Sequence, residues 1–147
     1  MAEPLGLQTA ESVLASQPFN DVVGARITEF GGGAATLELD IEPHHLQQYG
    51  VVHGGVYAYL ADNVLTFAAG SRVGASVITA GFSVSYVRSA RAGTLSARGV
   101  VSHADDRQAV CTAEIHAVSP EGETWLCAVA QGTIMRTADR SGSVAES

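Results

Sequence analysis

The sequence predicts an α+β domain in which long antiparallel strands wrap around one central helix. Runs that alternate apolar and polar residues with a period of two lie on both sides of one stretch that is apolar in every direction. The predicted order is therefore two strands, one helix and four strands, without an internal repeat. The chain has 147 residues, 46% of them hydrophobic and 16% charged, which suits one folded core and not two.

The chain begins with a short amphipathic helix, predicted at residues 4–16, which precedes a hairpin. Alternation starts at Val22 and runs to residue 28, and it resumes from residue 35 to residue 41. Three glycines at 31–33 join the two runs. A strand rather than a helix follows these glycines, and no Gly-Lys-Ser/Thr motif is present, so they predict a turn and not a phosphate-binding loop.

The central helix is predicted at residues 56–69, after Gly54 and Gly55 and with Gly70 as its C-cap. Pro43 ends the strand before it, and residues 44–50 are irregular and polar. Because the helix is apolar on nearly every side, we expect other structure to surround it. Six strands of one chain cover such a helix incompletely, which predicts association through sheet edges or helix faces.

All segments after Val77 are predicted to be strands that short turns separate. Turn signals occur at residues 91–93, 105–106 and 119–122. The four predicted strands are 78–86, 95–102, 109–118 and 125–135. We expect one domain at residues 1–137 and a disordered tail of small and polar residues at 138–147.

Charge and composition exclude several classes of function. Lys and Arg number 8 against 15 Asp and Glu, a net charge of −7, which argues against a nucleic-acid partner. No apolar run reaches about 18 residues, so no membrane span is expected. The first residues lack the basic segment that begins a secretory signal, and we expect a cytoplasmic protein. Cys111 and Cys127 are then expected to be reduced, small apolar residues.

Asp62 interrupts the apolar pattern of the central helix. Burial of an ionised carboxylate without partners is costly, and such local conflicts often mark functional sites. The alternative is that Asp62 lies with Asn63 on the one solvated side of the helix. Thr66 follows four residues later on the same face, where its hydroxyl is able to hold a water molecule that Asp62 also holds.

The start of the helix supplies a second candidate group. Backbone N–H groups at residues 53–55 lack partners within the helix, and the helix dipole is positive there. A polarised N-terminus and a carboxylate further along suit acyl transfer. His53 and Asp62 are separated by roughly 13 Å along the helix axis, so two antiparallel chains would bring both groups to one carbonyl more readily than one chain. This predicts a site shared across a dimer interface.

Other catalytic arrangements find less support in the sequence. His44, His45 and His53 form no compact ligand set, so no metal is expected. A serine nucleophile would need a Gly-x-Ser-x-Gly turn between a strand and a helix, and the sequence has no such motif. Tyr59 is interpreted as an aromatic residue of the core or of a pocket.

Residues 47–55, Gln-Gln-Tyr-Gly-Val-Val-His-Gly-Gly, together with Ala61 and Asp62, resemble the HGG signature of the hotdog-fold acyl-CoA thioesterases. The likeness continues through residues 78–93 and Asp106-Arg107, and it covers roughly residues 20–136. Two branches are most similar, the phenylacetate-pathway and the 4-hydroxybenzoyl-CoA thioesterases. The first usually has Asn in place of Gln47 and the second Glu in place of Asp62, so this sequence mixes the two.

The resemblance implies a hotdog fold and hydrolysis of an acyl- or aryl-CoA to the free acid and CoA. The Gly54 N–H would form the oxyanion hole, and Asp62 of the neighbouring subunit would be the nucleophile or general base. Gln47 would contact the active-site region, and Thr66 or Thr79 would position the water molecule. No cofactor is implied, because CoA is part of the substrate.

The remaining implied residues concern substrate binding and assembly. His53 is expected to orient the helix start, and Gly55 and Tyr59 to line the acyl site. Arg88 and Arg107 suit CoA phosphates, although each is equally well explained as an ordinary surface arginine. The expected assembly is a homodimer or a dimer of dimers. The alternative function is a non-catalytic acyl-CoA-binding or sensing module on the same fold.

Overall fold

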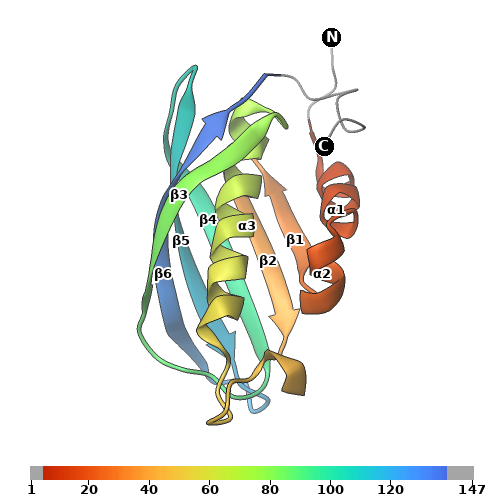
Figure 1. The fold of residues 1–147 in the computed structure, drawn as a ribbon, viewed down its shortest axis with the longest axis vertical. Helices are drawn as coiled ribbons and strands as arrows, with labels where there is room; N and C mark the ends of the chain where they lie inside the picture. The colour runs from red at the N-terminus through yellow and green to blue at the C-terminus, as the bar shows by residue number, and fades with distance from the viewer. Residues whose placement is uncertain (1–4, 139–147) are drawn as a thin grey trace.

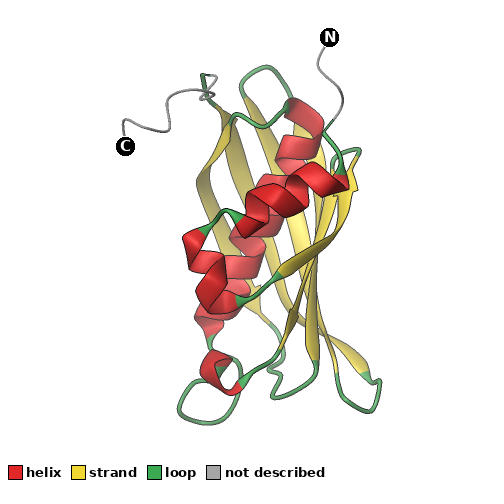
Figure 2. Cartoon of the chain, turned by 90° about the vertical axis from the view of Figure 1, so that its right-hand side faces the viewer, coloured by secondary structure: helices red, strands yellow, loops and turns green. Residues whose placement is uncertain are grey.

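The computed structural model describes residues 5–138. One antiparallel sheet of six strands, in the order β1-β2-β4-β5-β6-β3, curves around the long helix α3 (Gly54–Val73) (Figure 1). Two short helices, α1 (Leu7–Ala15) and α2 (Pro18–Val23), cover the side of α3 next to β1 (Figure 2). This is the predicted α+β architecture of a hotdog-like fold, and the fold prediction is confirmed.

The strand order follows from three hairpins and two connections between strands that are not neighbours, one through α3 and one from β3 back to β4. The hairpins join β1 to β2, β4 to β5 and β5 to β6, while α3 carries the chain to β3 at the far edge, beside β6. The strands are β1 (Arg26–Gly31), β2 (Ala34–Asp40), β3 (Val77–Tyr86), β4 (Thr94–Ala104), β5 (Gln108–Val118) and β6 (Thr124–Arg136).

A bulge in β3 determines which of its side chains face α3. Thr79 pairs with Ile134 and Gly81 with Thr133, so β3 has one extra residue, Ala80, at this point. Because of the extra residue, Thr79 and Phe82 both face the helix although they are three positions apart. This register matters for the site, since both residues lie beside Asp62.

The core lies between α3 and the concave face of the sheet. Its largest fully buried side chains include Leu60 and Leu65 of α3 and Leu37, Leu95 and Ile115 of the strands. A Cβ atom on Gly99 of β4 would lie 2.9 Å from the carbonyl oxygen of Val64. Only glycine therefore allows the helix backbone to lie this close to the middle of the sheet.

Two predicted boundaries are wrong. Gly70 is a buried residue inside α3 and not its C-cap; the helix continues to Val73, and Gly74 caps it with φ of 105°. Val22 and Val23 belong to α2 rather than to the first strand. Pro18 begins α2, and Gly24 ends it in the left-handed conformation, so the strand begins only at Arg26.

The ends of the chain are described in part. Helix α1 lies within the range predicted for the first helix. The predicted tail at 138–147 lies outside the described residues, apart from Ala138. Between residues 5 and 138, no helix has both the length and the hydropathy that crossing a membrane requires.

Candidate active site

Asp62 lies near the middle of α3 with a half-buried side chain, and the edge strand β3 supplies its partner. Thr79 donates its hydroxyl proton to Asp62 Oδ1, with the oxygens 2.7 Å apart. No other described residue donates a hydrogen bond to this carboxylate, so Oδ2 is left for water or substrate. The carboxylate is therefore oriented by one hydroxyl and retains a free oxygen, as a nucleophile or general base requires.

Thr66 acts on this carboxylate through Thr79 and not directly. Its Oγ1 lies 2.8 Å from the backbone oxygen of Asp62 and 2.9 Å from Thr79 Oγ1. Each hydroxyl has one proton to donate. When Thr79 donates to the carboxylate, Thr66 is the donor to Thr79, and its one proton then serves either this contact or the bond to the Asp62 backbone oxygen. The structure thus brings both candidate hydroxyls to Asp62, with Thr79 adjacent and Thr66 behind it.

Asp62 faces an open hollow of about 460 Å³ between α3, β3 and the start of α2. Gly55, Tyr59 and Phe82 are among its lining residues. Tyr59 Oη donates to Asn20 Oδ1 at 2.7 Å. Burial, and to a smaller extent the charge of Asp62, raises the pKa of Tyr59 to about 12, while a hydrogen bond with Asn63 opposes this. Tyr59 is therefore uncharged and forms part of the wall of the hollow. Its hydrogen bond to Asn20 also joins α3 to α2.

The start of α3 is the second predicted group. His53 is the N-cap, and its Nδ1 accepts the Gly55 N–H at 2.8 Å. The Gly54 N–H donates to no backbone or side-chain acceptor among residues 5–138. It lines a separate hollow of about 300 Å³ together with Tyr86 and Arg88. An unpaired N–H at a helix N-terminus is the kind of donor that stabilises an oxyanion.

Tyr86 controls the space next to Gly54. Its Oη donates to the carbonyl oxygen of Gly54 at 2.9 Å. A Cβ atom added to Gly54 would lie 3.0 Å from the same Oη and 3.2 Å from Cζ. Glycine at this position therefore keeps the helix start open, and the ring of Tyr86 forms one wall of the approach.

The loop before the helix is held by a buried histidine, His45, which the sequence analysis considered only as a metal ligand. Nδ1 of His45 accepts the Glu42 N–H at 2.9 Å, and Nε2 lies 2.7 Å from the carbonyl oxygen of Val23. The His53 N–H donates to the His45 carbonyl oxygen. The one available signal was Glu42, three residues before His45, as the first half of a capping box.

Gln47 holds the turn of this loop. Its side-chain oxygen accepts the Tyr49 N–H, and its backbone N–H donates to Val51 at 2.8 Å. Gln47 lines neither the Asp62 hollow nor the Gly54 hollow. Within one chain it therefore supports the helix start and does not touch the carboxylate.

The two arginines lie at opposite ends of α3. Arg88 follows β3 and lines the Gly54 hollow, with its guanidinium carbon 4.5 Å from the centre of the Trp125 ring. Arg107 lies in the β4–β5 turn, and its carbonyl oxygen accepts the Arg136 N–H. Because Arg136 pairs with Val77, Arg107 lies near the C-terminal end of α3. One chain does not bring these arginines together.

One chain also does not bring Gly54 and Asp62 together. They are eight residues apart on a continuous helix, about 12 Å along its axis. The hollow at Gly54 and the hollow at Asp62 share no lining residue. The predicted site residues thus form two separate groups on each chain, one with the carboxylate and its hydroxyls and one with the helix start and Arg88.

Comparison with known proteins identifies the family. Residues 49–123 match the family described as the thioesterase superfamily, and this segment contains the helix start, Asp62 and Thr79. The chain belongs to the thioesterase superfamily. The family resemblance that the HGG residues indicated is confirmed.

Individual relatives agree with this assignment. A Mycobacterium tuberculosis protein whose name proposes an esterase is 33% identical over 96 residues, which cover 62% of this chain and 69% of that protein. The structure of a thioesterase family protein from Silicibacter pomeroyi is 27% identical, with a TM-score of 0.80 and coverage of 87% of this chain and 95% of that chain. A mutant of the phenylacetic acid degradation protein PaaI from Thermus thermophilus is also 27% identical, with a TM-score of 0.73 and coverage of 82% and 100%.

Proposed function

We propose that this protein hydrolyses an acyl- or aryl-CoA thioester to the free acid and CoA, in a site that two chains share. The observation that carries the proposal is the half-buried Asp62 carboxylate, which Thr79 orients in an open hollow of a thioesterase-superfamily chain. Hydrolysis needs an activated water or a nucleophile, and Asp62 is the acidic residue that meets this need on α3.

In the general-base route, Asp62 takes a proton from water while the water oxygen attacks the thioester carbon. The Gly54 N–H of the partner chain stabilises the negative charge that forms on the carbonyl oxygen. The C–S bond then breaks, the free acid forms, and CoA leaves as a thiolate that takes up a proton. In the nucleophilic route, Asp62 attacks the thioester carbon, the C–S bond breaks and CoA leaves as a thiolate that takes up a proton. Water then hydrolyses the mixed anhydride, which gives the free acid and regenerates Asp62.

Two observations support a shared site. Asp62 and Gly54 line separate hollows, and the two residues lie about 12 Å apart along the axis of α3. The edge strand β3 also exposes 37% of Phe82 and 55% of Tyr86, which face the helix side. Antiparallel association of two chains through β3 and α3 would cover these residues and would bring Gly54 of one chain to Asp62 of the other.

The same association accounts for both arginines. Arg88 lies at the Gly54 end of α3, and Arg107 lies at the opposite end. An antiparallel partner would bring its own Arg107 end toward this Arg88. We propose that these guanidinium groups contact the CoA phosphates, which suit planar, bidentate donors.

The test is a hydrolysis screen with detection of free thiol across benzoyl-CoA, butyryl-CoA and decanoyl-CoA. We expect turnover of at least one substrate by the wild type and by Glu121→Gln, which makes the same carboxylate-to-amide change in an exposed turn. We expect Asp62→Asn to be nearly inactive. Saturable acyl-CoA binding without turnover would instead support the non-catalytic binding module.

A further inference from the structure

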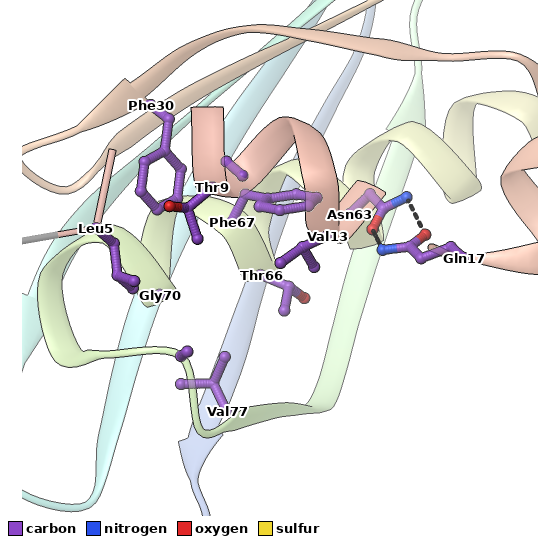
Figure 3. A pocket seen from close by; sticks show the side chains of 12 residues that line it. Leu5, Thr9, Val13, Gln17, Phe30, Asn63, Thr66, Phe67, Gly70 and Val77 are labelled. Atoms are coloured by element: carbon purple, nitrogen blue, oxygen red, sulfur yellow. Dashed lines mark hydrogen bonds between the residues drawn. The ribbon is translucent and has the colours of Figure 1, made fainter. Parts of the chain in front are cut away.

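A second cavity lies beside the Asp62 hollow, between α1, α3 and the start of β3 (Figure 3). Its volume is about 210 Å³, and its walls are mostly apolar, with the rings of Phe30 and Phe67 and the side chains of Val13 and Val77. An apolar cavity of about 150 Å³ is large enough to bind benzene, so this one has room for a hydrocarbon of roughly six carbons. Neither its volume nor its apolar lining has a role in the chemistry described above.

A pair of amides separates this cavity from the Asp62 hollow. Gln17 Nε2 donates to Asn63 Oδ1, and Asn63 Nδ2 donates to Gln17 Oε1, both at 3.1 Å (Figure 3). Gln17 and Asn63 are the two residues that line both the hollow and the cavity. Because each amide satisfies the other, the pair closes the passage without leaving a half-buried polar group unpaired.

The cavity is also close to the carboxylate, to which the two threonines connect it by hydrogen bonds. Thr66 lines it, contacts Thr79, and Thr79 donates to Asp62. A chain that leaves the thioester carbon at Asp62 and passes the amide pair would therefore enter an apolar space directly. A second copy of the protein or a peptide would not fit a volume of this size.

We propose that this cavity is the distal subsite for a linear acyl chain, and that the Gln17–Asn63 pair is a gate that sets the accepted chain length. The inference rests on the proposed thioester hydrolysis. With the pair closed, an aryl or short acyl group ends in the Asp62 hollow. A long chain has to separate the two amides, and each amide then loses its partner against an apolar wall, which disfavours that substrate.

The experiment measures kcat/KM for butyryl-CoA and decanoyl-CoA in the wild type, Asn63→Ala and Gln17→Ala. Each variant removes one of the two amides of the pair. We expect each to raise the ratio of kcat/KM for decanoyl-CoA to kcat/KM for butyryl-CoA about tenfold. Any effect of Asn63→Ala on the neighbouring Asp62 changes kcat/KM of both substrates by the same factor, so it cancels in the ratio. Gln8→Ala removes an exposed amide of α1 that lines neither space, and it should leave the ratio unchanged.

A filling variant tests the cavity itself. Val13→Phe extends a side chain that lines the cavity, and combined with Asn63→Ala it should abolish the gain for decanoyl-CoA while butyryl-CoA turnover is kept. An unchanged ratio in both gate variants, or a gain that survives Val13→Phe, would overturn the inference. If the wild type hydrolysed no acyl-CoA, the proposed hydrolysis itself would be refuted. The failure of the gate and the failure of the proposed function are therefore distinguishable.

Discussion

Thr79 on the edge strand β3 donates a hydrogen bond to the carboxylate of Asp62 on the central helix, at 2.7 Å. The contact is one of three polar contacts between these two elements, together with Thr66–Thr79 and the Tyr86 hydroxyl on the Gly54 carbonyl oxygen. It orients the carboxylate without neutralising its charge, because a hydroxyl contributes a dipole and no cation. Motion of the edge strand would therefore move the catalytic candidate as well.

Replacing Asp62 by Asn should stop the chemistry and preserve the fold. The amide keeps the size of the side chain, and its oxygen is still able to accept the Thr79 hydroxyl. We expect turnover to fall by about 100-fold or more, through loss of the base or nucleophile. The melting temperature should stay equal or rise, since a half-buried charge is gone. Steady-state kinetics and thermal unfolding check both outcomes, and near-normal turnover would remove Asp62 from the mechanism.

The two threonines should differ in importance. Thr79 contacts the carboxylate, whereas Thr66 reaches it through Thr79. We expect Thr79→Val to lower kcat by roughly tenfold, because hydrogen bonds to charged groups are the stronger ones. Thr66→Val should cost less, and Thr79→Ser should restore most of the activity. A larger loss of kcat in Thr66→Val than in Thr79→Val would contradict this order.

Two inactive variants should restore one another if the site is shared. Gly54→Val blocks the helix start, and Asp62→Asn removes the carboxylate. In a mixed dimer, one of the two sites has both native groups. With random pairing after co-expression, half of the dimers are mixed, so we expect about a quarter of the wild-type activity.

The same co-expression experiment also has an outcome that would contradict a shared site. A site contained in one chain would leave the mixed population as inactive as its parents. Adding Tyr86→Ala to Gly54→Val relieves the contact with the tyrosine ring. If that double variant alone regained activity, the loss in Gly54→Val would come from the displaced ring and not from the oxyanion hole. Light scattering should show that the active species is at least a dimer.

The buried thiols should be inert in the folded protein. Burial raises the pKa of Cys111 to about 11 and also raises the pKa of Cys127. At pH 8 a thiol reagent should therefore label neither residue until urea unfolds the chain. A thiol whose pKa is raised by folding stabilises the fold at neutral pH. This stability is lost as the pH rises from the unfolded value of about 8.5 through about 11.

The urea midpoint measures this loss. It should fall between pH 8 and pH 10.5 in the wild type, and it should fall less in Cys111→Ala. Rapid labelling of two thiols under native conditions would contradict the burial of these residues.

Alternation of apolar and polar residues predicted all six strands, because each strand has one face against α3 and one against solvent. Local patterns misplaced the end of α3 at Gly70. A glycine inside a helix is unfavourable in isolation, so the sequence favoured a helix end at Gly70, whereas the structure buries this residue within α3. The bulge at Ala80 was equally invisible, since it depends on the partner strand β6.

The sequence indicates candidate site residues where a residue type conflicts with the pattern around it. Asp62 in an apolar helix is such a contradiction, and the glycines at the helix start are another. The Gln17–Asn63 pair gave no such signal. Its members are 46 positions apart, and each looks like an ordinary surface amide until the fold brings them together. The structural role of His45 was not predicted for the same reason, because the carbonyl group that it contacts belongs to α2.

The extra residue Ala80 has a consequence for how this chain can vary. Side chains on the outer face of β3, such as Ser83 and Ser85, border only a shallow depression over β5 and β6 and are free to change. The pairing of the strand is not free. Phe82 pairs with Gly132 and Tyr86 with Ala128, and both face the helix because Ala80 is left out of the ladder. If the bulge closed and Ala80 paired with Thr133, every later residue of β3 would move by one position, and Phe82 and Tyr86 would turn to the outer face, away from Asp62 and Gly54. Deleting Ala80 would keep the pairs on both sides of it, so the chain should tolerate the loss of this residue better than the closure of the bulge.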